Sequence, residues 1–370
     1  MRIGVPKEIK NHEYRVGVTP DGACEIVAAG HTLSVQTGAG MAVGYPDDQY
    51  RKAGAHVVSD AKAAYACDLV IKVKELQPAE YALTHPDQIL YCYQHLAPDP
   101  PLLEAMLARG VSCVAYETVT APDNSLPLLM PMSQIAGRLA PQFGAWALQM
   151  ANGGSGVLLG GLPGVAPAKV VVIGGGAVGA GAARVALGMG ADVTLLDRSA
   201  AKLVHLEALF GARLKTVIST TQSIPPLVRD ADLVIGAVLL PGKLAPKLIT
   251  AEDVKHMRPG SVIVDVAIDQ GGICATSRAT SHTNPLYVEH GVVHCCVPNM
   301  PSAVARTATQ ALTQATLPYA LALANKGLRA ALAHDAGLRE GLQVHAGSVT
   351  HAGLAQDTGR VFVEAVNAIA

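Results

Sequence analysis

The sequence lacks long runs of like charge. Its 28 lysines and arginines nearly balance its 29 aspartates and glutamates, which leaves a net charge of −1. Proteins that bind nucleic acids or anionic membrane surfaces concentrate basic residues in patches or runs. We therefore expect no nucleic-acid partner and no binding to an anionic membrane surface.

The sequence also lacks an uninterrupted apolar segment, although half of its residues are hydrophobic and its mean hydropathy is +0.31. The most apolar stretch, 153–183, has Lys169 as its one charge and is interrupted by Pro163, Pro167 and several glycines. No apolar run approaches the roughly 20 residues that a membrane-spanning helix needs. Strands buried on both faces of a parallel sheet explain this composition better. Because the N-terminus shows no signal-peptide character, we expect a cytoplasmic protein with no membrane partner.

The cysteines lack the spacing of metal ligands. The seven of them are scattered, and several lie in apolar strand-like runs. We therefore predict reduced thiols buried in the core and no metal site. The adjacent Cys295 and Cys296 leave a vicinal disulfide as a less favoured alternative. The seven are Cys24, Cys67, Cys92, Cys113, Cys274, Cys295 and Cys296.

What the sequence does contain is a glycine-rich segment between two apolar runs. The first run, Lys169-Val-Val-Val-Ile173, is typical of a strand buried on both faces, and the second ends at Asp197. Between them, Gly174 allows a tight turn and Gly176 lets the backbone approach a pyrophosphate. Gly179 allows a helix and a strand to pack closely. Strand, glycines, helix, strand and terminal acid in this order predict a dinucleotide site.

The same segment predicts which dinucleotide binds. The helix after the glycines would offer unpaired N–H groups and a positive dipole end to phosphates. Asp197 can accept hydrogen bonds from a ribose diol and would repel a 2′-phosphate, so the predicted cofactor is NAD. A glycine-rich turn in an unrelated α/β protein is the alternative interpretation. The predicted contacts of this segment are Gly174, Gly176, Ala177, Val178, Gly179 and Asp197.

Strand and helix patterns alternate along most of the 370 residues, which exceeds the usual size of one domain. Helical segments separate the first five of six strands in the middle of the chain, as in a doubly wound sheet. The strands are expected at 170–173, 193–197, 214–218, 232–237, 262–267 and 292–297. The first part of the chain shows the same alternation, with strands expected at 2–6, 32–37, 67–73, 89–93 and 112–116.

Two flanking helical stretches, 133–150 and 301–325, suggest that the chain returns to its first domain. The predicted fold class is therefore α/β, with two doubly wound domains. An NAD-binding Rossmann domain, residues 132–300, is inserted in a discontinuous substrate/catalytic domain, residues 1–131 and 301–370. A cleft between two domains is the expected place for a small substrate.

Polar residues follow several of the predicted strands directly. Lys74, His95 and Asp269 come after apolar runs, as do Ser219 and Asn299. Because parallel strands end at the same edge of a sheet, such residues can converge on one crevice. In addition, Arg15 lies in the loop between the first strand and a helix predicted to begin at Pro20.

This set suits hydride transfer at a carbon that bears nitrogen or oxygen. Arg15 can hold a carboxylate bidentately, and Lys74 can polarise a carbonyl oxygen. His95 has the reference pKa of a proton shuttle. Asp269 can orient the imidazole, take a proton or bind the nicotinamide ribose. Taken singly, residues such as Arg15, Lys74 and Asp269 are more often solvated surface charges, and His95 could equally be a structural histidine.

The residues around these positions resemble the alanine dehydrogenases. The resemblance begins at Gly4-Val-Pro-Lys-Glu-Ile-Lys-Asn-His-Glu-Tyr-Arg-Val-Gly-Val-Thr-Pro20 and extends in the right order to about residue 330. The other matching motifs are Val73-Lys-Glu75, Tyr93-Gln-His-Leu96, Met130-Pro-Met-Ser-Gln-Ile-Ala-Gly-Arg138, Asp269-Gln-Gly-Gly272, Cys296-Val-Pro-Asn-Met-Pro301 and Thr316-Leu-Pro-Tyr319.

The resemblance implies reversible oxidative deamination of L-alanine to pyruvate and ammonia with NAD, by a subunit that forms homo-hexamers. It implies that Arg15, Lys74 and Asn299 bind substrate and that His95, Asp269 and Lys74 are catalytic. Among these, Asp269 also lies near the nicotinamide ribose. The further cofactor contacts that it implies are Ser133, Lys202, Ser219, Val266 and Met300.

The chain departs from the family pattern at Ser302, where glycine is expected, and at Cys295, where an aromatic residue is common. Lys202 stands where other members carry arginine. Three other activities stay open: the NAD-binding component of proton-translocating transhydrogenase, a saccharopine or lysine-forming dehydrogenase, and a catalytically silent NAD(H) sensor. The set Arg15, Lys74, His95 and Asp269 argues against the transhydrogenase component and the sensor. A saccharopine or lysine-forming dehydrogenase would need extra groups to hold a longer substrate.

Overall fold

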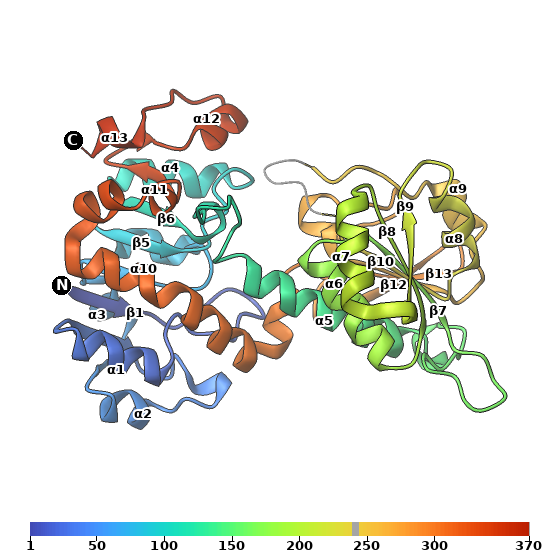
Figure 1. The fold of residues 1–370 in the computed structure, drawn as a ribbon. Coiled ribbons are helices and arrows are strands. Elements are labelled where there is room, and N and C mark those ends of the chain that lie inside the picture. Colours follow the sequence, from blue (N-terminus) through green and yellow to red (C-terminus); the bar gives the residue numbers. More distant parts are fainter. Residues whose placement is uncertain (239–243, 370) are drawn as a thin grey trace. The chain divides into compact units, whose positions relative to one another are not determined.

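The protein is described here by a computed structural model that covers residues 1–238 and 244–369. Two compact units make up the chain. The first combines Met1–Met132 with Val304–Ala370, and the second is Ser133–Ala303 (Figure 1). Each unit contains a parallel-dominated sheet with helices packed on it, which confirms the predicted α/β class.

The first unit contains an eight-stranded sheet with the order β15-β14-β6-β5-β4-β1-β2-β3. The strands from β6 to β3 are parallel, and the edge strands β14 and β15 are antiparallel. The strands are β1 (Arg2–Val5), β2 (Thr32–Gln36), β3 (His56–Val58), β4 (Leu69–Ile71), β5 (Ile89–Cys92), β6 (Ser112–Ala115), β14 (Leu342–His345) and β15 (Ser348–Val349). The helices are α1 (Pro20–Ala28), α2 (Asp47–Lys52), α3 (Ala61–Tyr65), α4 (Pro100–Arg109), α10 (Ala305–His334), α11 (Ala336–Arg339), α12 (Ala352–Thr358) and α13 (Ala365–Ala368).

Local sequence explains where the helices of this unit begin and end. The Thr19 side chain accepts a hydrogen bond from the Gly22 N–H at 3.1 Å, and Pro20 occupies the first turn of α1 as predicted. In α4, Asp99 caps the start in the same way, and Gly110 ends the helix in the left-handed conformation. The long helix α10 is interrupted at Gly327, whose φ of 74° and ψ of 165° are not helical.

The second unit contains a seven-stranded sheet with the order β12-β13-β11-β10-β7-β8-β9, parallel except for the edge strand β12. The chain order reverses beside β7, as in a doubly wound dinucleotide-binding sheet. The strands are β7 (Lys169–Ile173), β8 (Asp192–Asp197), β9 (Leu214–Ile218), β10 (Leu233–Gly236), β11 (Val262–Asp265), β12 (Leu286–Glu289) and β13 (Val292–Cys295). The helices are α5 (Met130–Ala147), which begins in the first unit, α6 (Ala177–Gly188), α7 (Ala200–Phe210), α8 (Ile224–Asp230) and α9 (Ala251–Lys255).

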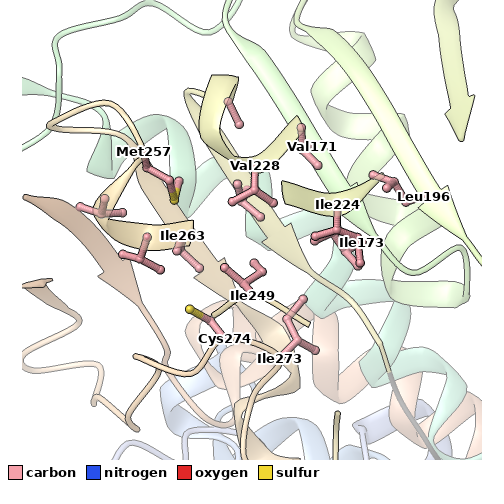
Figure 2. Close-up of a cluster of buried hydrophobic side chains, with 14 of the residues drawn as sticks. Val171, Ile173, Leu196, Ile224, Val228, Ile249, Met257, Ile263, Ile273 and Cys274 are labelled. Carbon is pink, nitrogen blue, oxygen red and sulfur yellow. The ribbon is translucent and has the colours of Figure 1, made fainter. Parts of the chain in front are cut away.

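The core of the second unit follows from strand alternation. Alternate residues of β7, such as Val171 and Ile173, point to one face of the sheet and pack against α8 (Figure 2). Ile224 and Val228 supply the α8 side of this cluster. Because both faces are covered by helices, the strands are apolar along their length, which accounts for the high hydropathy without a membrane. None of the helices in the described part of the chain is long and apolar enough to cross a bilayer.

The structure corrects several details of the prediction. The strand expected at 262–267 ends at Asp265, and a 3₁₀ turn, Val266–Gln270, follows it. The last predicted strand ends at Cys295 instead of residue 297. Cys24 is exposed, whereas the other six cysteines are buried as expected. Four short strands, β3, β12, β14 and β15, were not predicted.

Candidate active site

A lysine and a histidine side chain meet at the carboxyl ends of neighbouring strands in the first unit. Lys74 follows β4 and His95 follows β5, and the two strands pair in parallel. The Nζ of Lys74 lies 3.1 Å from Nε2 of His95. Because an ammonium group donates and does not accept, Nε2 accepts this hydrogen bond and Nδ1 carries the imidazole proton. The prediction that strand ends bring these residues together is confirmed at this pair.

This contact keeps His95 neutral. Removal of water by the surrounding protein and the positive charge of Lys74 both lower the pKa of His95, to about 3. A neutral imidazole can take up a proton, and a reacting group that draws the ammonium away would make it a better base.

Tyr93 lies beside both side chains. Its ring is 5.7 Å from Nζ of Lys74 and stacks on the His95 ring with centroids 6.0 Å apart. The Tyr93 hydroxyl donates to the carbonyl oxygen of Leu128 at 2.7 Å, which fixes the ring. This role could not be predicted from the sequence, because Tyr93 lies at the end of an ordinary apolar strand run.

Arg15 is almost fully buried and is paired with Glu13. Its Nε and Nη2 donate to the two Glu13 carboxylate oxygens at 2.7 and 2.6 Å, and both side chains are at most 1% exposed. Nη1 lies 3.0 Å from Sδ of Met132. Glu13 thus occupies one edge of the guanidinium fork, and the Nη1 side is turned toward the start of α5.

The backbone before Lys74 is held by a buried charge cluster. Glu8 accepts hydrogen bonds from the N–H groups of Val73 and Lys74 at 2.7 and 3.3 Å. Its other oxygen lies 3.0 Å from Nζ of Lys72, which also binds Glu80 at 2.9 Å. Sequence reasoning missed this cluster, because Glu8 and Lys72 are 64 residues apart and only the fold brings them together.

In the second unit, the glycine-rich turn has the steric properties that the sequence predicted. Gly174 has a φ of 109°, which favours glycine strongly. A Cβ on Gly179 would lie 1.7 Å from the Gly174 carbonyl oxygen, whereas a Cβ on Gly176 would meet nothing within 4 Å. No side chain caps α6 at Gly176. The first N–H groups of α6 therefore border open space.

Asp197 lies across this turn at the end of β8. Its Oδ2 accepts a hydrogen bond from the Gly175 N–H at 2.7 Å, and its Oδ1 accepts one from the Ser199 N–H at 2.8 Å. Lys202 Nζ is 3.9 Å from the carboxylate. Ser219, after β9, donates its N–H to the Asp197 carbonyl oxygen at 3.0 Å. Asp197, Lys202 and Ser219 thus gather at one edge of the sheet.

The remaining predicted residues also lie in the second unit. Asp269 and Val266 belong to the 3₁₀ turn after β11, and Asp269 is exposed. Asn299 follows β13 and has a φ of 56°, and Met300 beside it is buried. Ser133 lies in the first turns of α5 and is half-buried. Within the described ranges, no three histidines, cysteines or acids form a group that could hold a metal ion.

Ser302, one of the departures from the family pattern, packs without disturbing this region. Its hydroxyl donates to the Asn299 carbonyl oxygen at 3.1 Å and lies 3.0 Å from Nε2 of His282. Its own N–H also donates to that carbonyl oxygen, at 3.1 Å. The serine therefore secures the turn that carries Asn299.

Comparison with known proteins supports one family. Residues 4–136 match the model for the N-terminal domain of the alanine dehydrogenase/PNT family, and residues 140–352 match its C-terminal domain. The chain is 54% identical over 370 residues to the alanine dehydrogenase of Halomonas elongata, and this match covers 100% of both chains.

Solved structures agree with this result. An L-alanine dehydrogenase superimposes with a TM-score of 0.95 and 52% identity, covering 97% of this chain and 99% of that one. A transhydrogenase from Sinorhizobium meliloti superimposes with a TM-score of 0.81 over 95% of this chain and 99% of that chain, but at 23% identity it shows a shared fold alone. On these matches, which span both units, the chain belongs to the alanine dehydrogenase/PNT family.

Proposed function

We propose that this protein is an NAD-dependent dehydrogenase that interconverts L-alanine with pyruvate and ammonia. The observation that carries the proposal is the Lys74–His95 pair at the strand ends of a chain 54% identical to a named alanine dehydrogenase. The pair supplies an electrostatic group and a neutral proton acceptor side by side. Interconversion of a carbon–nitrogen and a carbon–oxygen bond needs both.

The glycine-rich turn fits a dinucleotide. The open space at Gly176 and the uncapped start of α6 offer N–H groups to a pyrophosphate. Each Asp197 oxygen keeps a lone pair for a ribose hydroxyl after binding its backbone N–H, which favours NAD over NADP. When bound, the nicotinamide ring supplies the acceptor or donor of a hydride. The residues proposed to hold NAD are Ser133, Gly174, Gly176, Ala177, Val178, Gly179, Asp197, Lys202, Ser219, Val266, Asp269 and Met300.

The proposal assigns substrate binding to Arg15, Lys74 and Asn299. Because Glu13 occupies the Nε edge of Arg15, the guanidinium is proposed to bind the alanine carboxylate through Nη1. Glu13 also neutralises Arg15 when the substrate is absent, which lets a guanidinium remain buried. Lys74 is proposed to bind the oxygen of pyruvate and to stabilise the charge that develops on it.

His95 is proposed as the acid and base. Loss of hydride from Cα of alanine, with its amine uncharged, leaves an iminium ion, and water then attacks the iminium carbon. Neutral His95 accepts one proton of that water and gives it to the amine nitrogen. As the C–N bond breaks, the remaining hydroxyl proton passes to His95, so that ammonia departs and pyruvate forms. Asp269 is proposed to stabilise the protonated imidazole or to bind the ribose, and its exposure is compatible with either role.

The second candidate function is that of a transhydrogenase component, which the shared fold supports. Such a protein passes hydride between nicotinamides and has no need for an amino-acid site. Arg15, Lys74 and His95 would then have no substrate to act on. The Lys74–His95 contact therefore favours the dehydrogenase.

The experiment that tests the proposal follows NADH formation at 340 nm with purified protein and L-alanine. Reactions with L-serine, L-lysine, L-glutamate and no amino acid run in parallel, each with NAD and with NADP. We expect turnover with alanine and NAD. Silence with every amino acid, while NADH still binds, would overturn the proposal and favour the transhydrogenase component.

We also propose that the protein is a cytoplasmic homo-hexamer, as the family resemblance implies. Support for self-association comes from the segment 150–168, which contains no charged residue and is mostly exposed. Its exposed side chains include Leu158 and Leu162, both more than 60% exposed. Exposed apolar patches of this kind mark protein–protein contacts. Light scattering after size-exclusion chromatography measures the oligomer directly.

A further inference from the structure

The loop that carries His95 is fastened to a carboxylate from the neighbouring strand end. Glu117 lies just after β6, in the 3₁₀ turn Tyr116–Thr118, and β6 pairs in parallel with β5. Its Oε1 accepts hydrogen bonds from the N–H of His95 at 2.8 Å and from that of Gln94 at 3.1 Å. Its Oε2 lies 3.2 Å from the same Gln94 nitrogen. Two successive backbone donors therefore converge on one side chain.

These hydrogen bonds hold a backbone conformation that His95 would otherwise avoid. The φ of His95 is 46°, in the left-handed region that is disfavoured for residues with a side chain. In this conformation the imidazole stacks on the Tyr93 ring, with the ring centroids 6.0 Å apart. Backbone strain of this kind persists only where the surroundings fix it, and Glu117 supplies that constraint.

The neighbouring strand repeats the arrangement. At the end of β4, Glu8 accepts the N–H groups of Val73 and Lys74, as Glu117 accepts those of Gln94 and His95. The 3.1 Å contact between Lys74 and His95 thus joins two side chains whose backbones are each held by a separate carboxylate. Glu8 is neutralised by Lys72, whereas Glu117 forms no salt bridge within the described residues. This difference makes Glu117 the simpler one to replace.

We propose that Glu117 is a positioning residue for the reaction: by binding the Gln94 and His95 N–H groups it holds the His95 imidazole against Lys74. This inference rests on the proposed function of His95. Glu117 acts through the backbone and takes no proton from the substrate. Its role therefore depends on accepting hydrogen bonds and not on its charge.

The test compares Glu117→Ala with Glu117→Gln in the full-length protein. The amide oxygen of glutamine can accept both hydrogen bonds that Oε1 accepts, whereas alanine accepts neither. We expect kcat for alanine to fall about 10- to 100-fold in Glu117→Ala, because a small misplacement of a catalytic group has an effect of this size. Glu117→Gln should stay within about threefold of the parent, since it restores the acceptor.

Two further measurements separate positioning from a general loss of structure. The acid limb of the pH profile of kcat/KM should move to higher pH in Glu117→Ala, because an imidazole that leaves Lys74 regains its ordinary pKa. NADH affinity, which depends on the second unit, should not change. Asp60→Ala is the matched control, because it removes another carboxylate that accepts a backbone N–H in this unit, that of Ala63 at 2.9 Å. It should keep the parent pH profile.

The parent protein shows whether the proposed function itself fails, because it would then not turn over alanine. With an active parent, a Glu117→Ala variant that keeps kcat and pH profile overturns the inference. A Glu117→Gln variant as impaired as Glu117→Ala also overturns it, since charge would then matter more than hydrogen bonding. If Glu117→Ala does not fold, Glu117→Asp replaces it. Its shortened carboxylate should shift the pH profile in the same direction, and an unshifted profile would contradict the inference.

Discussion

At the scale of single residues, the most unusual feature is the lysine enclosed between two carboxylates in the first unit. Lys72 is 1% exposed, and its Nζ contacts Glu8 and Glu80. Buried charges of this kind are stable only as a complete set, because each one needs its partners to compensate for lost hydration. Since Glu8 also holds the backbone of Lys74, the cluster links stability to the site.

We expect Lys72→Met to lower the free energy of unfolding by about 3–5 kcal/mol at pH 7, because it leaves two buried carboxylates without a cation. Burial already raises the pKa of Glu8 against the opposing effect of Lys72. Removing the lysine raises that pKa further, so the folded variant binds a proton more readily than the unfolded chain. The decrease in the free energy of unfolding should therefore be large at pH values above the raised pKa of Glu8. It should shrink as the pH falls toward the ordinary pKa of glutamate.

Urea denaturation at pH 7 and at pH 5 measures this effect. Lys169→Met is the control, because Lys169 pairs with Asp230 on the surface and both side chains are about half exposed. Its loss should cost less than about 1 kcal/mol. Equal midpoints for the two variants at pH 7 would contradict the prediction.

A second prediction at this scale concerns the pKa of His95 in the Lys74–His95 pair. Replacing Lys74 by methionine removes the ammonium that lowers the pKa of His95, so that pKa should rise from about 3 toward its ordinary value. NMR titration of the histidine ring protons measures it, with a His95→Gln variant to assign the signal. A His95 resonance that titrates at the same pH in the parent and in Lys74→Met would show that the ammonium is not the cause.

At the scale of elements, the glycines of the turn before α6 have opposite steric surroundings. Gly179→Ala would place a methyl group 1.7 Å from the Gly174 carbonyl oxygen, whereas Gly176→Ala would place one in open space. Overpacking typically costs about 1–3 kcal/mol, and this contact is with backbone that cannot rotate away. Gly179→Ala therefore tests the stability of the turn, whereas Gly176→Ala tests the binding of its proposed ligand.

We expect Gly179→Ala to lower the melting temperature clearly. Gly176→Ala should cost less than about 1 kcal/mol, the value of an N-cap change, and yet weaken NADH binding because its methyl group occupies the space proposed for the pyrophosphate. Thermal unfolding without ligand and fluorescence titration with NADH measure the two effects. Unchanged NADH affinity in Gly176→Ala would place the pyrophosphate elsewhere.

The elements also show what the sequence could predict. The buried parallel strands β7, β8 and β10 were predicted because apolar runs bounded by glycine or polar residues identify them. The strands β14 and β15 were not, since β15 has two residues and β14 depends on pairing with β6, more than 200 residues away in the chain. Short edge strands carry little local signal, because tertiary pairing decides them.

The site also combines features that local sequence predicts with features that only the tertiary fold creates. That Lys74 and His95 lie together follows from parallel strands ending at one edge, so strand prediction was sufficient. Glu117 and Glu8 bind backbone N–H groups that are 22 and 65 residues away. Nothing in their local sequence distinguishes them from solvated acids. Their roles became visible only in the folded chain.

At the scale of the whole molecule, each unit has a sheet and a buried core of its own. The second unit also carries the charge-free segment 150–168, which exposes Leu158 and Leu162 to solvent. Leucines as exposed as these bury only a minor part of their apolar surface within their own unit. Their place in the molecule is explained if they are buried between subunits.

We expect Leu158→Asp combined with Leu162→Asp to reduce the proposed hexamer to smaller species, because two carboxylates would be buried in an apolar contact. Light scattering measures the mass. Val204→Asp is the matched control, because Val204 is also exposed, at 65%, but lies on α7. An unchanged mass in the double variant would exclude this segment from the contact.

The discontinuous first unit has a consequence for synthesis. The edge of β6 stays uncovered until β14 pairs with it, and about 230 residues, including the entire second unit, lie between Ala115 and His345. At ordinary rates of translation this interval lasts roughly 10 to 50 seconds. During that time an exposed strand edge can pair with other nascent chains. The sheet of the first unit is therefore completed only after the second unit has been synthesised. Slow translation after residue 303 should increase aggregation of the newly made protein.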